Sequence, residues 1–367
     1  MSNEFVRSKI YYFQFLVILF FSAFYPKIVY SISLEYLNSS VFPTKERFEN
    51  TQIGGLSGLT QVDGKYWAVS DDKGQFGEPR IYEFSITLNE TEFKIKPSSV
   101  IILKNKNGSL FGKKVLDLEG ISSNDKTFLI ANEGLLNLKP REMPSILEFS
   151  NKGKLLNEIK IPEKYLPERI GEQKKGVRSN GSFEGISLAP KGNSLWVITE
   201  QPLIQEMSKW KQGEAGFSRL LIYKKKSKKW DIDSEWKYPL DLPFELGHES
   251  NVVLGQGCSE VLALGDESAI ILERGVTTSG TQIFYNLKLF EVKINKNLND
   301  SLLVKKLVFD FSTVKDKISD GKGLDNLEGI AWGPEVNGHK TLIFISDDNF
   351  TPLQRTIWIA LKITDNN

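Results

Sequence analysis

The sequence predicts an all-β fold, a β-propeller of five blades, each a four-stranded antiparallel sheet. The first observation is a short motif, Ser or Glu next to Gly, that recurs along the 367 residues. The second is that a polar turn and another apolar strand follow each motif, as expected of paired strands rather than βαβ units. Six blades are the alternative, because the 76 residues from Glu184 to Glu260 leave room for a degenerate blade.

The recurring motif marks the expected first strand of each blade. Its copies are Leu56-Ser57-Gly58-Leu59, Leu118-Glu119-Gly120-Ile121, Phe183-Glu184-Gly185-Ile186, Cys258-Ser259-Glu260-Val261 and Leu327-Glu328-Gly329-Ile330. The innermost strand of a propeller blade lines the central channel, so we expect the Ser or Glu to face one shared axis. Gly beside it suits a place where neighbouring backbones crowd. In the fourth copy either Ser259 or Glu260 could hold the axial position.

Alternating apolar residues predict the other strands of each blade. Second strands are expected at Tyr66–Ser70, Phe128–Ala131, Leu195–Thr199, Ala269–Leu272 and Leu342–Ser346, and third strands at Arg80–Ile86, Ser145–Ser150, Arg219–Tyr223, Ile283–Val292 and Thr356–Ile363. Fourth strands are expected at Phe93–Leu103, Leu155–Ile161, Trp230–Tyr238 and Leu302–Phe309. The last blade lacks a fourth strand, and Ile32–Leu37 can supply it, closing the ring and protecting its edges.

The N-terminal residues predict export. Arg7 and Lys9 precede an apolar run from Ile10 to Tyr25, the order of a secretory signal peptide. The run is shorter than the roughly 20 residues that span a bilayer. We therefore expect residues 1–31 to be a signal peptide, with an uncleaved anchor as the alternative, and residues 32–367 to be a secreted or periplasmic propeller domain. Stable membrane association is expected only if the segment stays uncleaved.

The composition disfavours several classes of binding partner and site. The formal charge is +1 and no basic stripe interleaved with aromatic residues stands out, which disfavours nucleic acid as a partner. Cys258 is the only cysteine, so the fold depends on its core rather than on an internal disulfide. Only two histidines are present, which argues against a zinc site and against a serine-histidine-aspartate triad. A monomer acting on a small anionic ester is expected.

The axial side chains are candidate metal ligands: Ser57, Glu119, Glu184, Glu260 and Glu328. Carboxylates gathered on one axis raise each other's pKa and cannot all stay ionised without compensation. Ca²⁺, which takes six to eight oxygen ligands in a tolerant geometry, would resolve that conflict. The alternative is that these side chains bond neighbouring backbone amides around a water-filled channel.

Residues that follow the second strands form a second candidate set. The expected catalytic residues are Asp71, Asp72, Glu133, Glu200, Glu273, Arg274 and Asp347, and the expected substrate-binding residues are Arg80, Arg219 and Arg355. Arginine forks suit bidentate binding of phosphate or carboxylate groups. The alternative role of these arginines is to form salt bridges with the adjacent acids. Together the two sets predict a channel mouth with a cation below and guanidinium groups around it.

Four segments carry a resemblance to a known family. They are Gly55–Leu59 with Ser70-Asp71-Asp72, Asn180–Ile186 with Trp196 and Glu200, Ile271–Gly275, and Asp325–Gly329 with Ser346–Asn349. At these residues the chain resembles the phytase-like family called "esterase-like activity of phytase", over about residues 50–362. The resemblance implies hydrolysis of phosphate or carboxylic esters.

Two functions are therefore expected from different classes. The first is an exported, calcium-dependent hydrolase acting on a phosphate or other ester at the mouth of the channel. The second is a non-catalytic propeller that serves as a binding or scaffold module around a structural cation. A propeller hosts both, so the fold alone does not decide between them.

Overall fold

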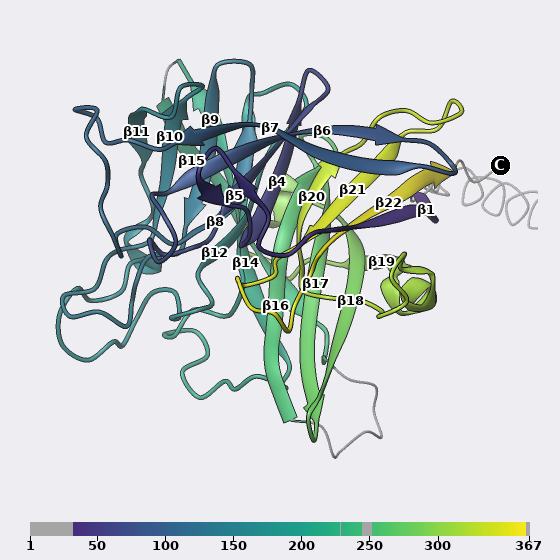
Figure 1. The fold of residues 1–367 in the computed structure, drawn as a ribbon. Coiled ribbons are helices and arrows are strands. Elements are labelled where there is room, and N and C mark those ends of the chain that lie inside the picture. Colours follow the sequence, from purple (N-terminus) through teal and green to yellow (C-terminus); the bar gives the residue numbers. More distant parts are fainter. Residues whose placement is uncertain (1–31, 228, 244–251, 365–367) are drawn as a thin grey trace, which may run out of the picture.

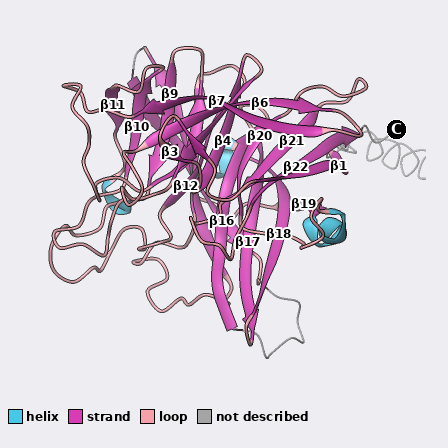
Figure 2. Ribbon diagram, in the orientation of Figure 1, coloured by secondary structure: helices cyan, strands magenta, loops and turns pink. Residues whose placement is uncertain are grey.

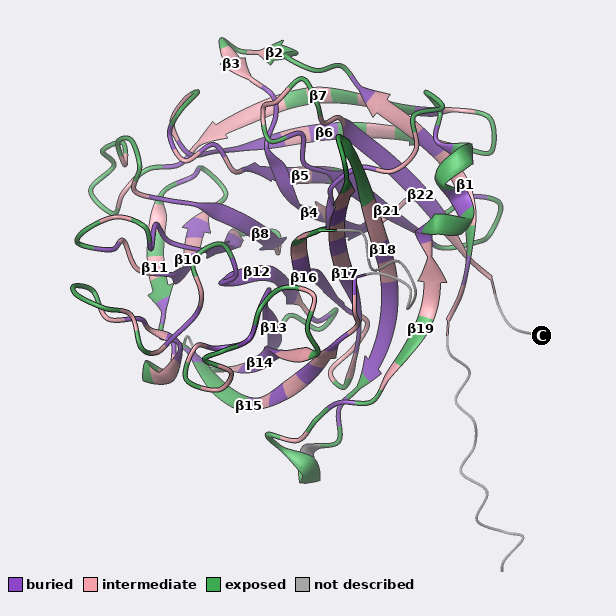
Figure 3. Cartoon of the chain, turned by 90° about the horizontal axis from the view of Figure 1, so that it is seen from below, coloured by how far each residue is buried: buried purple, intermediate pink, exposed green. Residues whose placement is uncertain are grey.

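The computed structural model describes residues 32–227, 229–243 and 252–364. It is built from five four-stranded antiparallel sheets and one two-stranded hairpin, β2 (Arg47–Phe48) with β3 (Thr51–Gln52). The sheets surround a common centre, with buried residues toward it and exposed residues at the rim (Figure 3). The five-bladed propeller is confirmed, and the six-bladed alternative is excluded. The predicted signal peptide lies outside the described residues, among which no helix is long and apolar enough to cross a membrane.

Each blade runs from the centre outward in chain order. The inner strands are β4 (Leu56–Val62), β8 (Leu118–Ser123), β12 (Phe183–Leu188), β16 (Val252–Ala263) and β20 (Leu327–Trp332). The second strands are β5 (Lys65–Ser70), β9 (Thr127–Asn132), β13 (Ser194–Thr199), β17 (Ser268–Ser279) and β21 (Thr341–Ser346). We number the blades I to V in this order, as Figure 1 labels their strands.

The outer half of each blade follows the same order. The third strands are β6 (Arg80–Leu88), β10 (Ser145–Ser150), β14 (Gly216–Lys226), β18 (Gln282–Lys293) and β22 (Thr356–Thr364). The fourth strands are β7 (Phe93–Ile102), β11 (Leu155–Ile159), β15 (Lys229–Leu240), β19 (Lys305–Asp310) and β1 (Ser33–Phe42). Strand β1 pairs antiparallel with β22 and completes blade V, so the predicted closure by the N-terminal strand is confirmed.

Helix in the described residues is confined to three short 3-10 segments, as Figure 2 shows. They are η1 (Glu163–Tyr165), η2 (Lys296–Leu298) and η3 (Phe311–Lys317). Tight turns join the first two strands of the blades. In blade I, Asp63 and Gly64 both have positive φ, 51° and 77°. Two such residues are what a two-residue hairpin needs for its twist to match that of the strands.

The hydrophobic core is divided into five clusters, each shared by two adjacent blades. Trp196 of blade III, for example, packs with Cys258 and Ile271 of blade IV. Because side chains of a strand alternate between its two faces, every sheet presents apolar residues to both neighbours. Each blade is therefore stabilised by the two blades beside it. The centre of the ring is lined by polar residues that lie before and at the start of the inner strands.

Candidate active site: an acidic cavity at one end of the channel

All five inner strands carry a β-bulge at the same place in the motif. Each pairing with its second strand shifts register there, at the positions that we call the inner ring: Ser57, Glu119, Glu184, Ser259 and Glu328. A bulge inserts an unpaired residue and redirects its side chain. In blade IV the sequence left two candidates for the axial position, and the bulge shows that Ser259 holds it. Glu260 lies at the position that glycine holds in the other four blades.

The glycine of the motif is required by the neighbouring blade. A Cβ built on Gly120 would lie 2.2 Å from the carbonyl oxygen of Glu184, and one on Gly185 would lie 2.5 Å from the amide nitrogen of Val261. Real Cβ atoms do not approach backbone this closely. The inner strands are consequently packed so tightly that their Glu side chains are brought within reach of one another.

A second ring of five residues lies beside the inner ring, just after the second strand in four blades and within β17 in blade IV. In blade II, the Glu133 amide donates to the Asp117 carbonyl, and the register places the corresponding residue of each blade in the same way. These residues, which we call the outer ring, are Asp71, Glu133, Glu200, Arg274 and Asp347. Blade IV thus contributes an arginine where the other four blades contribute an acid.

The two rings meet in one cavity of about 420 Å³, which we call the acidic cavity. Its lining includes seven carboxylates and two cationic side chains: Asp71, Glu119, Glu133, Glu184, Glu200, Glu328, Asp347, Lys73 and Arg274. The sequence predicts a cation layer below a separate layer of catalytic acids. The structure instead places members of both sets around the same space.

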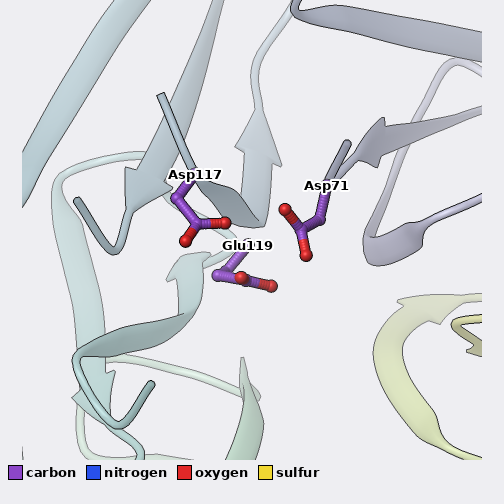
Figure 4. Close-up of side chains that lie close together, drawn as sticks. All are labelled: Asp71, Asp117 and Glu119. Atoms are coloured by element: carbon purple, nitrogen blue, oxygen red, sulfur yellow. The ribbon is translucent and has the colours of Figure 1, made fainter. Parts of the chain in front are cut away.

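Two groups of three carboxylates lie within 4.8 Å of one another in this region. The first consists of Asp71, Asp117 and Glu119, whose side chains point toward one another (Figure 4). The second consists of Glu119, Glu133 and Glu184. Glu119 belongs to both, because its bulge places it between the end of β5 and the inner strand β12.

The first triad has its own compensating charge. The Lys73 ammonium lies 3.0 Å from Asp117 Oδ2 and 3.8 Å from Asp71 Oδ2. Burial, together with the neighbouring Asp117 carboxylate, raises the pKa of Asp71 well above its usual range. Burial opposes the charge of Lys73, but Asp71 and Asp117 outweigh it and raise the pKa of the ammonium. These shifts favour the protonated form of Asp71 and the charged form of Lys73.

The second triad forms no salt bridge within the described residues, although Lys73 lowers the pKa of Glu133 and Arg274 lowers that of Glu184 from a greater distance. Glu133 also accepts hydrogen bonds from the amides of Gly181 and Ser182. Glu119 and Glu184 are each 7% exposed, and within the described ranges their carboxylates accept no hydrogen bond and form no salt bridge. Burial and then nearby carboxylates, Asp71 for Glu119 and Glu200 for Glu184, raise both pKa values well above the usual range. Burial, with Asp117, raises the pKa of Glu133 to about 8. In the absence of a cation these shifts favour the protonated forms of the three carboxyl groups.

Arg274 is the one predicted arginine that lines the cavity. Its guanidinium bonds Glu200 Oε1 at 2.9 Å and Asn326 Oδ1 at 2.7 Å, and it forms an ion pair with Glu328. It therefore links the outer ring to the inner ring. Glu328, predicted as a metal ligand, is held by this arginine and by the Asn326 amide at 2.8 Å.

The other predicted arginines lie in ion pairs away from the acidic cavity. Arg80 is fully buried against Asp72, Arg219 pairs with Glu206 and Asp300, and Arg355 pairs with Asp320 and Asp325. None of the three lines the cavity. Their guanidinium groups already have carboxylate partners, so the structure does not bring them to the mouth that the sequence suggested.

Four further predicted residues also point elsewhere. Ser57 donates to the Leu118 carbonyl at 3.1 Å, and Glu260 accepts from the amides of Ile186 and Val261, so both bond backbone rather than a shared axis. Asp72 serves Arg80. Glu273 precedes Arg274 and so points to the opposite face of its strand. There it accepts from Tyr238 at 2.6 Å and pairs with Lys305.

Sequence reasoning missed Asp117 and Lys73. Asp117 lies two residues before Glu119, the same offset that separates Asn326 from Glu328, so aligning blades II and V would have indicated it. Lys73 follows Asp71 by two residues in a turn. No repeat signal marks it, because the other blades have no lysine there.

The chain belongs to the phytase-like family described as "esterase-like activity of phytase", whose model matches residues 51–350. The matched range includes both rings and Lys73. No curated protein matches the chain.

Solved structures are similar at low identity. An endo-arabinase from Bacteroides thetaiotaomicron VPI-5482 is 13% identical, covers 88% of this chain and 99% of its own, and has a TM-score of 0.42. A xylan β-1,4-xylosidase from Bacillus halodurans C-125 is 12% identical, covers 86% of this chain and 54% of its own, and also has a TM-score of 0.42. A putative oxidoreductase (glucose dehydrogenase) from Thermus thermophilus is 10% identical, with 91% and 100% covered and a TM-score of 0.41.

Proposed function

We propose that this protein is an exported, cation-dependent hydrolase of a phosphate or other ester, with its reaction at the acidic cavity. The observation that carries the proposal is the triad Glu119, Glu133 and Glu184, three buried carboxylates that form no salt bridge among the described residues. Family membership favours ester hydrolysis as the reaction class. Export is predicted from residues that the structure does not describe.

The residues of the triad fit a hard divalent cation, and we propose Ca²⁺. All three donors are carboxylate oxygens, the ligands that Ca²⁺ prefers, and they lie within 4.8 Å of one another. Glu119 and Glu184 have no competing hydrogen-bond donor among the described residues. A bound cation would neutralise these charges and polarise the oxygen of an ester. The first triad is a poorer candidate, because Lys73 already lies against it.

The chain's own residues supply the remaining requirements of hydrolysis. Lys73 and Arg274 are the cationic side chains that line the acidic cavity, so they are the groups that can orient an anionic ester there. Asp71 lines the same cavity, and burial together with Asp117 raises its pKa well above the usual range. It is the group that we assign to protonate the leaving oxygen, a role that requires a raised pKa.

A binding or scaffold module with a structural cation is the second candidate. The observation that favours it is the pairing of Arg80, Arg219 and Arg355 with buried or half-buried acids, which leaves fewer free groups for catalysis. Under this alternative the cation would stabilise the ring without any turnover.

One assay separates the two candidates. The purified protein is incubated with p-nitrophenyl phosphate, phytate and nucleotides, in Ca²⁺ and in chelator, and its melting temperature is measured in parallel. We expect turnover of at least one ester in Ca²⁺ and its loss in chelator. No turnover of any ester, with a melting temperature that still falls in chelator, would establish the scaffold. Equal turnover in chelator would refute the cation requirement.

A further inference from the structure

Blade IV extends beyond the other blades on the side of the acidic cavity. Its strands β16, β17 and β18 have twelve residues each. The inner and second strands of blades II and III, β8, β9, β12 and β13, have six each, whereas the outer strands β14 and β15 of blade III have eleven and twelve. The six additional residues correspond to roughly 20 Å of strand. In Figure 1 these three strands project below the rest of the ring. The added residues lie at the start of β16, which is also the end at which the acidic cavity opens.

On one face of blade IV, the additional residues continue the lining of the acidic cavity outward. Arg274, which lines the cavity, is followed two residues later in β17 by Val276, so both side chains lie on the same face. Val276 pairs with Tyr285 and Thr278 pairs with Ile283 on β18, and residues directly opposite each other share a face. The face thus changes from charged at Arg274 to apolar at Val276, Tyr285 and Ile283.

A loop of blade V completes this surface. Leu353 lies between Thr351 and Gln354, all three of which line the cavity, and the Gln354 amide donates to the Tyr285 hydroxyl at 3.1 Å. Together the apolar residues that line the mouth are Leu254, Val276, Ile283, Tyr285 and Leu353. We call this set the apolar wall.

Three residues of the apolar wall are exposed, whereas Val276 and Tyr285 are half-buried. Leu254 is 51% exposed, Ile283 47% and Leu353 83%. Isolated exposed aliphatic residues are ordinary, but a contiguous group beside a polar site is typical of ligand binding. The acidic cavity offers carboxylates and cationic side chains, and the apolar wall beside it offers apolar side chains. The two surfaces together fit a molecule that has both a polar and an apolar part.

We propose that the substrate is amphipathic, an ester with an alkyl or aryl group that lies on the apolar wall while its polar group enters the acidic cavity. This inference rests on the proposed function and names its substrate class. The polar group is bound near Arg274, and the apolar group extends along Val276 and Ile283. Small, fully polar esters use only the first of these two surfaces.

The test is a homologous series. In Ca²⁺, hydrolysis is measured for monoalkyl phosphates from ethyl to octyl and for 4-nitrophenyl esters from acetate to octanoate. We expect kcat/KM to rise about two- to fourfold per methylene, where fourfold corresponds to about 0.8 kcal/mol for a fully buried CH₂. A rate that is independent of chain length in both series would overturn the inference.

A variant pair locates the effect. The double variant Leu254→Ser and Ile283→Ser is expected to reduce the chain-length dependence to less than half, because both side chains leave the apolar wall. Leu156→Ser on β11 removes a similarly exposed leucine (47%) that does not line the cavity and should retain the full dependence. An unchanged dependence in the double variant would contradict the assignment to the wall.

Binding separates this inference from the proposed function. Methylphosphonate and octylphosphonate are titrated against the full chain in Ca²⁺ by calorimetry. If no ester is hydrolysed but octylphosphonate binds at least tenfold more tightly, the proposed hydrolase fails and the amphipathic ligand stands. Equal affinities, or no binding of either compound, would overturn the amphipathic ligand.

Discussion

The two ends of the central channel are built by the same five strands and have opposite chemistry. The acidic cavity holds seven carboxylates where the inner strands begin. At the other end a cavity of about 350 Å³, here the distal cavity, is lined mostly by aliphatic, hydroxyl and amide residues, with Asp63 and Asp125 exposed on turns. The two cavities share no lining residue.

The difference lies in what the polar side chains bond. In the distal cavity, Ser122 accepts from the Leu188 amide at 2.8 Å and Ser187 accepts from the Ala263 amide at 3.0 Å, so each hydroxyl joins its blade to the next. In the acidic cavity, Glu119 and Glu184 bond no described group. The distal cavity therefore uses these hydroxyls to join blades, whereas the acidic cavity leaves Glu119 and Glu184 free to bind a ligand.

The largest expected difference between the ends is a pH dependence that arises at the acidic cavity alone. Glu133 keeps its proton to about pH 8 in the folded protein but loses it near its usual 4.5 when unfolded. The folded state then binds more protons, so in chelator the free energy of unfolding falls as pH rises between these values. The slope is about 1.4 kcal/mol per pH unit for each such proton. Chemical denaturation at several pH values measures it, and stability that is constant or rising across this window would contradict the prediction.

Next in size is the loss of calcium binding in Glu184→Gln. Removing one of three ligands is expected to weaken Ca²⁺ binding about 100-fold, equivalent to about 2.7 kcal/mol at 25 °C. Glu328→Gln is the matched control, because Glu328 is already neutralised by Arg274 and Asn326. Calorimetric titration compares the two variants. If Glu328→Gln loses affinity as much as Glu184→Gln, the cation is not confined to the second triad.

A smaller effect is expected at the distal cavity from Ser187→Ala. The variant leaves the buried Ala263 amide without its acceptor, which costs about 1–3 kcal/mol of stability. The calcium-dependent rise in melting temperature should remain at its wild-type value, since Ser187 does not line the acidic cavity. Thermal melts with and without Ca²⁺ test both statements. A reduced calcium effect would mean that the two ends are coupled.

The smallest effect is expected from Gln61→Glu, which adds a carboxylate to the distal cavity. Gln61 is half-buried near the exposed Asp63. The change in stability should be within about 0.5 kcal/mol, because solvated carboxylates repel each other weakly. No calcium binding should appear at this end. A second calcium site in the variant would show that carboxylate number, rather than burial without partners, determines the binding.

Local repetition made the fold predictable from the sequence. The motif marks each inner strand in the sequence. The last blade has one strand fewer than the others, which predicts that an N-terminal strand completes it. The register of blade IV was ambiguous because Ser259 and Glu260 both fit the pattern. It is decided by a bulge and by crowding between blades, which are properties of the assembled ring.

The candidate site was less predictable because pairing depends on residues distant in the chain. Arg219 is neutralised by Asp300, which lies 81 residues away, and nothing in the motif indicates that pair. Glu119 and Glu184 were predicted because their positions repeat. Lys73 was missed because it belongs to one blade, and Asp117 because only Asn326 of blade V corresponds to it. A repeat identifies positions that all blades share, whereas the chemistry of this site depends on how individual blades differ.

The pairing of β1 with β22 also determines when blade V can form during folding. Ser33 pairs with Thr364, so blade V cannot form until almost the whole described chain is present. Contacts this far apart in sequence slow folding, since the ends must meet before the contact stabilises anything. Until then both strands have unpaired edges that invite association with other chains. A shortened chain that lacks β22 should therefore aggregate rather than form a four-bladed ring.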